Sequence, residues 1–294
     1  MLKRTFVLGE DWVFLKIYTG INTADRLVSA QVFTLSASLE SEGIIQKWFF
    51  IRYSDANGFH LRVRFCLAET RYLAELIERI GTVLKPLIDD NIVRSIAYDT
   101  YFREIERYGE SVYPQTEEIF HIDSICVAAC LSQINQQAGD VNLRWTTAVA
   151  MINDLLDAAS ISLLEKKEII VRCRDSFRRE FEVEKPEQTR LFDKKYRDNR
   201  KSINEAVDHN CFPQEIFCAL ERRKNALKTV TDTWERINIP SILHMTCNRM
   251  FITSNRLCEL TIYEYLSRYY VSEIARQKYN KEASHNNDAK RCGA

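Results

Sequence analysis

The order of strand-like and helix-like segments in the first hundred residues constrains the fold of this chain more than any other feature. Apolar residues alternate or recur at helical spacing in six successive segments: strand 12–18, helix 23–41, strand 47–53, strand 60–65, helix 70–89 and strand 92–101. The turn-forming residues 54–58 join the two middle strands into a hairpin. The resulting order, β-α-β-β-α-β, predicts a ferredoxin-like sheet with its helices on one face.

Beyond Pro114 the pattern becomes helical throughout, so the fold class is expected to be α+β. Helices are predicted at 115–137, 142–157, 161–180, 188–208, 213–236 and 256–279, separated by breaks such as Pro213 and Pro240. We therefore expect a ferredoxin-like half over 1–113, a helical half over 114–280 and a disordered polar tail over 281–294. The connection at 111–116 looks too short for a flexible linker, so both halves should pack into one functional unit.

Composition and charge exclude several classes of protein. The 294 residues are 46% hydrophobic, enough for a substantial core. Lys plus Arg and Asp plus Glu are 41 each, so the chain offers no general attraction to nucleic acid or to anionic lipid. Glu10 and Asp11 interrupt the apolar start that a signal peptide needs, and no apolar run approaches the ~18 residues of a membrane span.

Cysteine and glycine usage predicts a cytoplasmic protein without a metal or cofactor. The nine cysteines form no CxxC pair, and their odd number argues against a complete disulfide framework. Cys126 and Cys130 are four residues apart on one predicted helix with no second close pair, which favours buried apolar side chains over zinc ligands. The glycine motifs of nucleotide-binding loops do not occur in the sequence.

A row of basic side chains is predicted on one face of the strand at 60–65. Period-two alternation puts His60, Arg62 and Arg64 on the same face and turns the residues between them toward the core. Such a row needs solvent, acidic partners or an anionic ligand, so both a salt-bridged surface and an anion site remain open. Arg107, after the last predicted strand, could reach this face, and its planar fork suits a carboxylate.

The apolar segment 239–249 contains one histidine, His244, followed by an Asn-Arg pair at Asn248 and Arg249. A histidine in such a segment is most often a core residue with a satisfied hydrogen bond. The alternative is a proton carrier, because a neutral imidazole can accept and return a proton near pH 7.

Several ordered motifs give the chain a family resemblance. They are FxxGEDWVFLKIY, KWFFIRYSDANGFHLRVRF, REIERYG, the FHIDS that follows it, and SILHMTCNRMFITSNRLCE, and they extend from about Phe6 to Tyr270. Together they resemble the thiopeptide-type bacteriocin biosynthesis family, which includes the C-terminal elimination region of lantibiotic dehydratases. Two departures stand out: Glu110 replaces the glycine that commonly follows Arg-Tyr-Gly, and the SDANGFH hairpin is slightly longer than the family's compact form.

The resemblance implies an enzyme that eliminates glutamate from glutamylated Ser or Thr of a ribosomally made precursor peptide, leaving dehydroalanine or dehydrobutyrine. His244 would be the base or a proton shuttle, and Arg62, Arg64 and Arg107 would jointly bind carboxylate and stabilise developing charge. His60, Asn248 and Arg249 are expected to contact the substrate. The expected partners are the glutamylated peptide and a separate glutamylating dehydratase subunit, and the chain could form a homodimer.

Two other functions remain open within the same family. One is formal [4+2] cycloaddition between two dehydroalanines, which builds the pyridine ring of thiopeptides. The other is a non-catalytic peptide-binding scaffold. The retained arginines and His244 favour elimination, because cycloaddition expels no glutamate and has less use for a carboxylate anchor.

Overall fold

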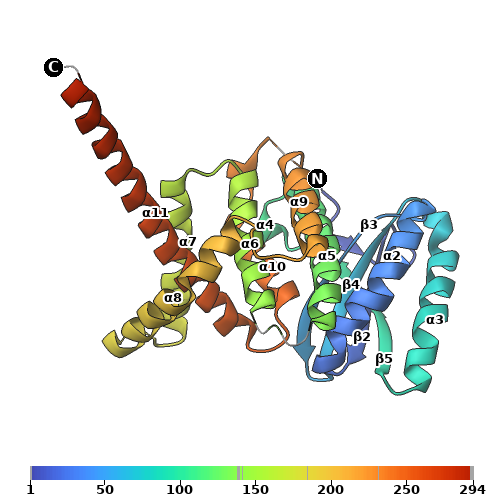
Figure 1. The fold of residues 1–294 in the computed structure, drawn as a ribbon. Coiled ribbons are helices and arrows are strands. Elements are labelled where there is room, and N and C mark those ends of the chain that lie inside the picture. Colours follow the sequence, from blue (N-terminus) through green and yellow to red (C-terminus); the bar gives the residue numbers. More distant parts are fainter. Residues whose placement is uncertain (1, 138–139, 141, 184, 231, 292–294) are drawn as a thin grey trace.

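A four-stranded antiparallel sheet forms the centre of the N-terminal half (Figure 1). The computed structural model describes residues 2–137, 140, 142–183, 185–230 and 232–291, with side chains as far as residue 280. The strands are β2 (Trp12–Thr19), β3 (Ile45–Asp55), β4 (Gly58–Leu67) and β5 (Val93–Asp99), in the spatial order β3-β4-β2-β5. This order, with every neighbouring pair antiparallel, confirms the predicted ferredoxin-like arrangement.

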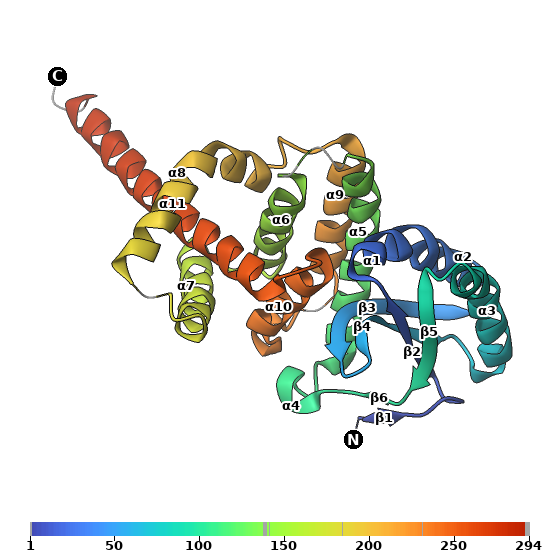
Figure 2. The same ribbon diagram turned by 90° about the horizontal axis from the view of Figure 1, so that it is seen from below.

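The two crossover helical segments lie on one face of this sheet (Figures 1 and 2). Between β2 and β3 the chain forms a 3₁₀ turn (Ile21–Thr23), α1 (Ala24–Arg26), a π-helical segment (Leu27–Val32) and α2 (Phe33–Ser41); between β4 and β5 it forms a 3₁₀ turn (Thr70–Tyr72) and α3 (Leu73–Asp89). A small second sheet pairs β1 (Thr5–Phe6) with β6 (Tyr101–Phe102). The alternate β4 residues Leu61, Val63 and Phe65 are almost fully buried, as alternation predicts.

The second half is helical, as predicted from the periodicity after Pro114. A short helix, α4 (Ile105–Tyr108), precedes it. Its own helices are α5 (Tyr113–Gln136), α6 (Leu143–Ala158), α7 (Leu163–Glu180), α8 (Pro186–Val207), α9 (Gln214–Lys228), α10 (Ile239–Met250) and α11 (Asn255–Arg291). A 3₁₀ turn at Trp234–Arg236 precedes α10. The N-terminal sheet and these helices lie against each other through α5 and α10, which both contact β3 (Figure 2).

Three boundaries differ from the sequence-based expectations. The helix predicted over 213–236 ends at Lys228, and α10 was not predicted because Pro240 was interpreted as a break. Proline is in fact favourable in a first turn, where its missing N–H would have no helical partner. Helix α11 continues to Arg291, whereas a disordered tail was expected from residue 281; no proline or glycine interrupts residues 281–291, and 292–294 lie outside the described residues.

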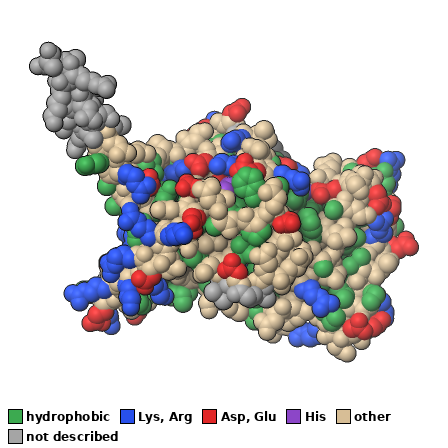
Figure 3. Space-filling view, in the orientation of Figure 1, with side chains coloured by type: hydrophobic (Ala, Val, Ile, Leu, Met, Phe, Trp, Pro, Cys, Tyr) green, Lys and Arg blue, Asp and Glu red, His purple; other side chains and the backbone are tan. Residues whose placement is uncertain are grey.

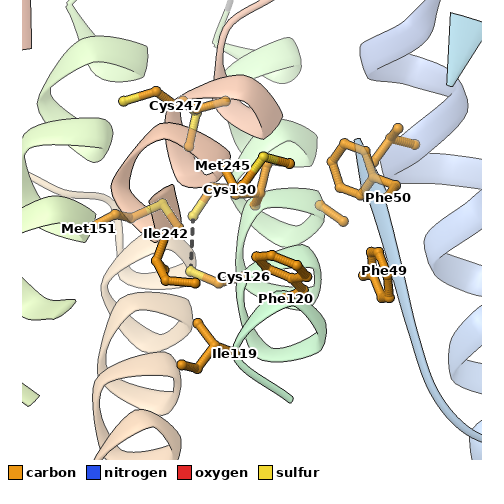
Figure 4. Close-up of a cluster of buried hydrophobic side chains, with 14 of the residues drawn as sticks. Phe49, Phe50, Ile119, Phe120, Cys126, Cys130, Met151, Ile242, Met245 and Cys247 are labelled. Atoms are coloured by element: carbon orange, nitrogen blue, oxygen red, sulfur yellow. Dashed lines mark hydrogen bonds between the residues drawn. The ribbon is translucent and has the colours of Figure 1, made fainter. Parts of the chain in front are cut away.

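The core between the two halves is made by α5, α10 and β3, whose apolar side chains interlock in Figure 4. The ring centre of Phe49 from β3 lies 5.4 Å from that of Phe120 on α5, and Ile242 from α10 lies beside Cys126 of α5. Such contact gives the two parts a continuous core. Cys126 and Cys130 are buried in it with their sulfurs 4.0 Å apart, as unpaired thiols rather than a disulfide.

The outer edge of β3 is closed by side chains instead of another strand. Nδ1 of His121 lies 3.2 Å from the N–H of Trp48 and 3.0 Å from its carbonyl, and the N–H of Phe50 donates to Oγ of Ser124 at 3.2 Å. An open strand edge leaves backbone groups unpaired and free to recruit another chain. Side chains of helix α5 therefore form hydrogen bonds with the β3 backbone that a neighbouring strand would otherwise form.

The surface carries charges of both signs. Figure 3 shows Lys and Arg side chains gathered at the end of this face formed by α7, α8 and α11, with acidic side chains among them. Within the described part of the chain, no helix combines the length and the apolar character that crossing a membrane requires.

Candidate active site

Helix α10 has one partly exposed stripe. Asn238 caps its first turn by accepting a hydrogen bond from the backbone N–H of Ser241 at 3.3 Å. After Pro240, the α10 residues that keep partial exposure are Ser241, His244 and Asn248, while the others are buried. Their spacing of three and four residues puts them on one side of the helix. This side is where α10 can meet a substrate.

The imidazole of His244 has one nitrogen bound within the protein, and its side chain is partly exposed. Its Nδ1 lies 2.8 Å from Oε2 of Glu259 on α11, and its side chain is 25% exposed although Glu259 is buried. A carboxylate only accepts hydrogen bonds, so Nδ1 carries a proton, and in the neutral ring Nε2 then holds the lone pair. His244 is therefore arranged to take up a proton at Nε2.

Arg64 on β4 is a buried cation without an anion. Its guanidinium carbon lies 4.4 Å from the ring centre of Phe14, 5.1 Å from Tyr101 and 5.2 Å from Phe49. Only 8% of the residue is exposed, and within the described residues it has no hydrogen bond or ion pair, its Nε included. Burial lowers the pKa of Arg64 because the charged form loses its hydration. The charge of Glu104 acts on Arg64 in the opposite sense but forms no ion pair with it, so the guanidinium can still accept a negative group from outside the chain as a partner.

Arg62 and His60 lie on the same face of β4. The Arg62 guanidinium stacks on the ring of Tyr53 with 3.4 Å between its carbon and the ring centre, and its Nε donates to Nε2 of His60 at 3.2 Å. His60 is fully buried, and its Nδ1 is 3.1 Å from the carbonyl of Gly58. Burial lowers the pKa of His60, which keeps the ring neutral and able to accept from Arg62. His60 orients Arg62.

Arg107 connects the end of the sheet region to α10. Its Nε donates to Oγ of Ser241 at 3.1 Å, and its own carbonyl accepts from the Asn238 side chain at 2.8 Å. Nη1 lies 3.5 Å from a carboxylate oxygen of Glu104, a contact at the limit of hydrogen bonding. These contacts fix Arg107 one helical turn before His244, with 37% of its side chain exposed.

An aromatic cluster joins the surroundings of Arg64 and Arg107. Phe49, which packs on Arg64, lies 5.4 Å from Phe120, and Phe120 lies 5.4 Å from Tyr108, on which Arg107 packs at 5.2 Å. The structure thus brings Arg64, Arg107 and α10 to the same junction between the sheet and the helices. Arg62 lies two residues farther along β4, toward the hairpin.

Asn248 and Arg249 form hydrogen bonds with the backbone of β3, although Nη2 of Arg249 has no hydrogen-bond partner among the described residues. The Asn248 side chain accepts from the N–H of Arg52 at 2.9 Å and donates to its carbonyl at 3.0 Å, so both amide groups are used by β3. Nε of the fully buried Arg249 donates to the carbonyl of Phe50 at 2.9 Å. Both residues continue the closure of the β3 edge that α5 begins.

The largest described groove lies elsewhere. It has a volume of about 760 Å³ and runs between the α6–α7 turn and the segment that leads into α10, with Arg172 and Trp234 among the residues that line it. Asn238 and Pro240 form its end nearest the junction, and the predicted site residues do not line it. The arginine and histidine chemistry, and not cavity size, locates the candidate site.

Sequence patterns alone missed two contributors. Glu104, near Arg107, belongs to the quoted REIERYG motif, and Glu259 ends the motif that contains His244. Glu104 precedes the helix that carries Arg107, three residues before it, whereas the partner of Glu259, His244, lies on another helix. The signal that could have marked Glu259 is its place in an otherwise apolar helical stretch, four residues before Tyr263.

The comparison with known proteins agrees with this architecture. The chain matches the family described as "Lantibiotic biosynthesis dehydratase C-term" over residues 12–270, which takes in both halves and every candidate residue. The chain belongs to this dehydratase family. It is 23% identical over 258 residues to the subtilin biosynthesis protein SpaB of Bacillus subtilis, and 23% identical over 257 residues to the epidermin biosynthesis protein EpiB of Staphylococcus epidermidis. These alignments cover 84% and 82% of this chain but 24% of each relative, so this dehydratase-family chain spans about a quarter of their length.

Solved structures share the fold of this dehydratase-family chain. The tRNA-dependent lantibiotic dehydratase MibB from Microbispora superposes with a TM-score of 0.70 at 23% identity, covering 93% of this chain and 29% of MibB. TbtD, a pyridine synthase from thiomuracin biosynthesis, gives a TM-score of 0.57 at 14% identity, covering 90% of this chain and 99% of TbtD. The same fold therefore occurs both within a large dehydratase and as a protein of about this size.

Proposed function

We propose that this chain eliminates glutamate from glutamylated Ser or Thr residues of a precursor peptide, leaving dehydroalanine or dehydrobutyrine. Membership of the dehydratase family supports this reaction class, and the observation that carries the proposal is the buried guanidinium of Arg64, which has no ion-pair partner among the described residues. The partners we propose are the precursor peptide and a glutamylating dehydratase subunit that supplies the ester.

Elimination needs a base next to the Cα hydrogen of the esterified residue. The base takes the Cα proton, the C–H electron pair becomes the Cα=Cβ bond, and the Cβ–O bond breaks to release glutamate as a carboxylate. We assign the base to His244, because its Nε2 is free among the described residues while Nδ1 is held by Glu259. The protonated imidazole then returns its proton to solvent or to the departing product.

The departing glutamate is negatively charged at two carboxylates, and each can be stabilised by a cation. A glutamyl ester carries a free side-chain carboxylate and develops a second carboxylate as the Cβ–O bond breaks. Arg64 would anchor one of them, since a carboxylate there supplies the missing counter-charge and the aromatic rings exclude water that would weaken the pair. Arg107, fixed near His244 through Ser241, would stabilise the other. Arg62 adds positive charge, oriented by His60.

Asn248 and Arg249 are not included in the proposed substrate contacts. The amide of Asn248 is used by the β3 backbone, and Arg249 is enclosed between β3 and α5. Their role in the proposal is to hold α10, and with it His244, against the edge of the sheet.

Cycloaddition is the second candidate, favoured by the match to nearly the full length of a pyridine synthase. That reaction joins two dehydroalanines and releases no glutamate, so it gives no reason for an unpaired cation in the aromatic cluster. A non-catalytic scaffold would have no use for a histidine that is held at one nitrogen and free at the other.

The test supplies a pre-glutamylated precursor peptide to the purified protein without ATP, metal or tRNA and follows the products by mass spectrometry. The expected result is release of free glutamate and a dehydro residue at the esterified position. Arg71→Lys, a change at an exposed arginine paired with Glu69, is the matched control and should keep full activity. An unchanged ester, together with ring formation from a peptide containing two dehydroalanines, would establish the cyclase instead.

A further inference from the structure

Glu259 is a buried carboxylate whose two oxygens are both used. It lies on α11 with 1% of its surface exposed; Oε2 lies 2.8 Å from Nδ1 of His244, and Oε1 accepts a hydrogen bond from the hydroxyl of Tyr263 at 2.7 Å. Tyr263 is equally buried, one helical turn farther along α11. Burying a carboxylate is unfavourable unless partners stabilise it, so the choice of partners indicates its purpose.

Its partners differ from those of the other buried acids. Six carboxylates are buried among the described residues: Asp25, Glu117, Asp123, Asp154, Glu259 and Glu264. Five of them form an ion pair with a lysine or arginine: Asp25 with Arg52, Glu117 with Arg103, Asp123 with Arg223, Asp154 with Lys224 and Glu264 with Arg178. In the described part of the chain, Glu259 pairs with a histidine alone, and the side chain of that histidine is 25% exposed. A carboxylate that only stabilises the fold would not need a histidine partner, whose charge changes near neutral pH.

Groups from four elements lie around or near this pair. Helix α11 contributes Tyr263 and Arg256, α7 contributes Glu180 and Cys173, α10 itself contributes Cys247, and Arg107 of α4 reaches Ser241 one turn away. Arg256 is bound to Glu180, which leaves Glu259 to His244. Burial, followed by the charge of Glu259, raises the pKa values of Tyr263 and Cys247 and raises that of Cys173 to about 12, so these groups stay neutral.

We propose that Glu259, held by Tyr263, is the positioning residue for His244: it fixes the Nδ1–H tautomer, directs Nε2 to the junction and stabilises the imidazolium formed when His244 takes the Cα proton. The inference rests on the proposed elimination. In that step the proton moves from Cα to Nε2, the C–H pair forms the double bond and glutamate leaves with the Cβ–O pair. Glu259 keeps its charge throughout, as a carboxylate behind a histidine base generally does.

The activity test measures single turnovers of pre-glutamylated peptide over a range of pH. Glu259→Gln should slow elimination by about 10- to 100-fold with little change in peptide binding. The acidic limb of the rate profile should move to lower pH, because an imidazolium without the carboxylate is less stable. Glu259→Asp should restore part of the rate, and Tyr263→Phe should give a smaller loss in the same direction.

Glu264→Gln is the matched control, because it removes a second buried glutamate of α11 that is bound to arginines instead of histidine. It should lower thermal stability without moving the pH profile. Combining Glu259→Gln with His244→Ala should cost no more rate than His244→Ala alone, because both changes remove one function. Independent, additive losses, or an unmoved pH profile in folded Glu259→Gln protein, would overturn the proposal.

A second measurement does not depend on activity. Nitrogen-15 NMR of the histidine rings should show His244 as the Nδ1–H tautomer in the unmodified chain and as a mixture in Glu259→Gln. An Nε2–H tautomer in the unmodified chain would overturn the positioning role. If the NMR result holds and no glutamate is released, the proposed reaction fails while the Glu259–His244 pair stands.

Discussion

The buried arginines of this chain fall into two groups that differ in what neutralises them. Arg223 and Arg249 meet Asp123, with N–O distances of 2.7 and 3.4 Å, and Arg52 meets Asp25 at 2.5 Å. Arg64 is also buried, but its neighbours are aromatic rings. The arginines of the first group each have an ion-pair partner within the chain, whereas Arg64 has none among the described residues. Burial alone therefore does not separate these arginines, and the presence of an internal ion-pair partner does. Under the proposed function, the missing partner of Arg64 is a carboxylate of the substrate.

The largest expected effect is on protein stability, when the arginines paired with Asp123 lose their anion. Asp123→Asn removes the anion shared by Arg223, Arg249 and the hydroxyl of Thr246, leaving two buried cations uncompensated. The free energy of unfolding should fall by about 3–5 kcal/mol. Urea denaturation followed by circular dichroism measures this change. If the free energy of unfolding falls by less than about 1 kcal/mol, the buried arginines do not need Asp123 for stability. The contrast between these arginines and Arg64 would then be wrong.

The next effect concerns the base. His244→Ala should leave the fold and peptide binding largely intact while slowing elimination by about 100-fold or more, typical of losing a positioned acid–base group. The side chain is partly exposed, so its removal leaves no enclosed cavity. Single-turnover kinetics with pre-glutamylated peptide separates binding from chemistry. Near-normal elimination by the folded variant would remove His244 from the mechanism and favour the cyclase or scaffold.

Replacing Arg64 should have the opposite effect on stability to replacing Asp123. Arg64→Met removes a buried cation that has no internal partner, so stability should stay equal or rise, while elimination falls by at least about tenfold. Arg64→Lys keeps the charge but loses the planar fork, and its activity should also fall. The same denaturation and turnover experiments apply to both variants. A large loss of stability in Arg64→Met would place Arg64 with the structural arginines.

The smallest effect is in the pH dependence of stability, where two buried histidines should act with opposite signs. Burial disfavours the charged form of His209, but Asp154, 2.9 Å away, outweighs this effect and raises the pKa of His209. The stability that protonated His209 contributes to the fold is fully present below the unfolded pKa near 6.5. It is lost as pH rises through the folded pKa. His60, with its lowered pKa, contributes stability above about 6.5 that is lost as pH falls. Each slope is limited to about 1.4 kcal/mol per pH unit. His209→Gln should flatten the alkaline side of the stability curve only.

Sequence patterns predicted the sheet because alternation and helical spacing are local properties. They also predicted that His60, Arg62 and Arg64 share a face, which the contact between Arg62 and His60 supports. They did not predict the role of Asn248, whose partner Arg52 is 196 residues away. Nor could they separate Arg64 from the structural arginines, since that distinction depends on acids brought in from other elements.

The closure of the β3 edge also sets an order of events during synthesis. The strand leaves the ribosome early, His121 and Ser124 follow 73 and 74 residues after their partners, and Asn248 follows 196 residues after its own. Until α10 has been made, the nascent sheet presents an incompletely paired strand to the cytosol or to other chains being translated nearby. A chaperone that shields strand edges would therefore be needed most when translation pauses between β3 and α10, and least once the last quarter of the chain is free.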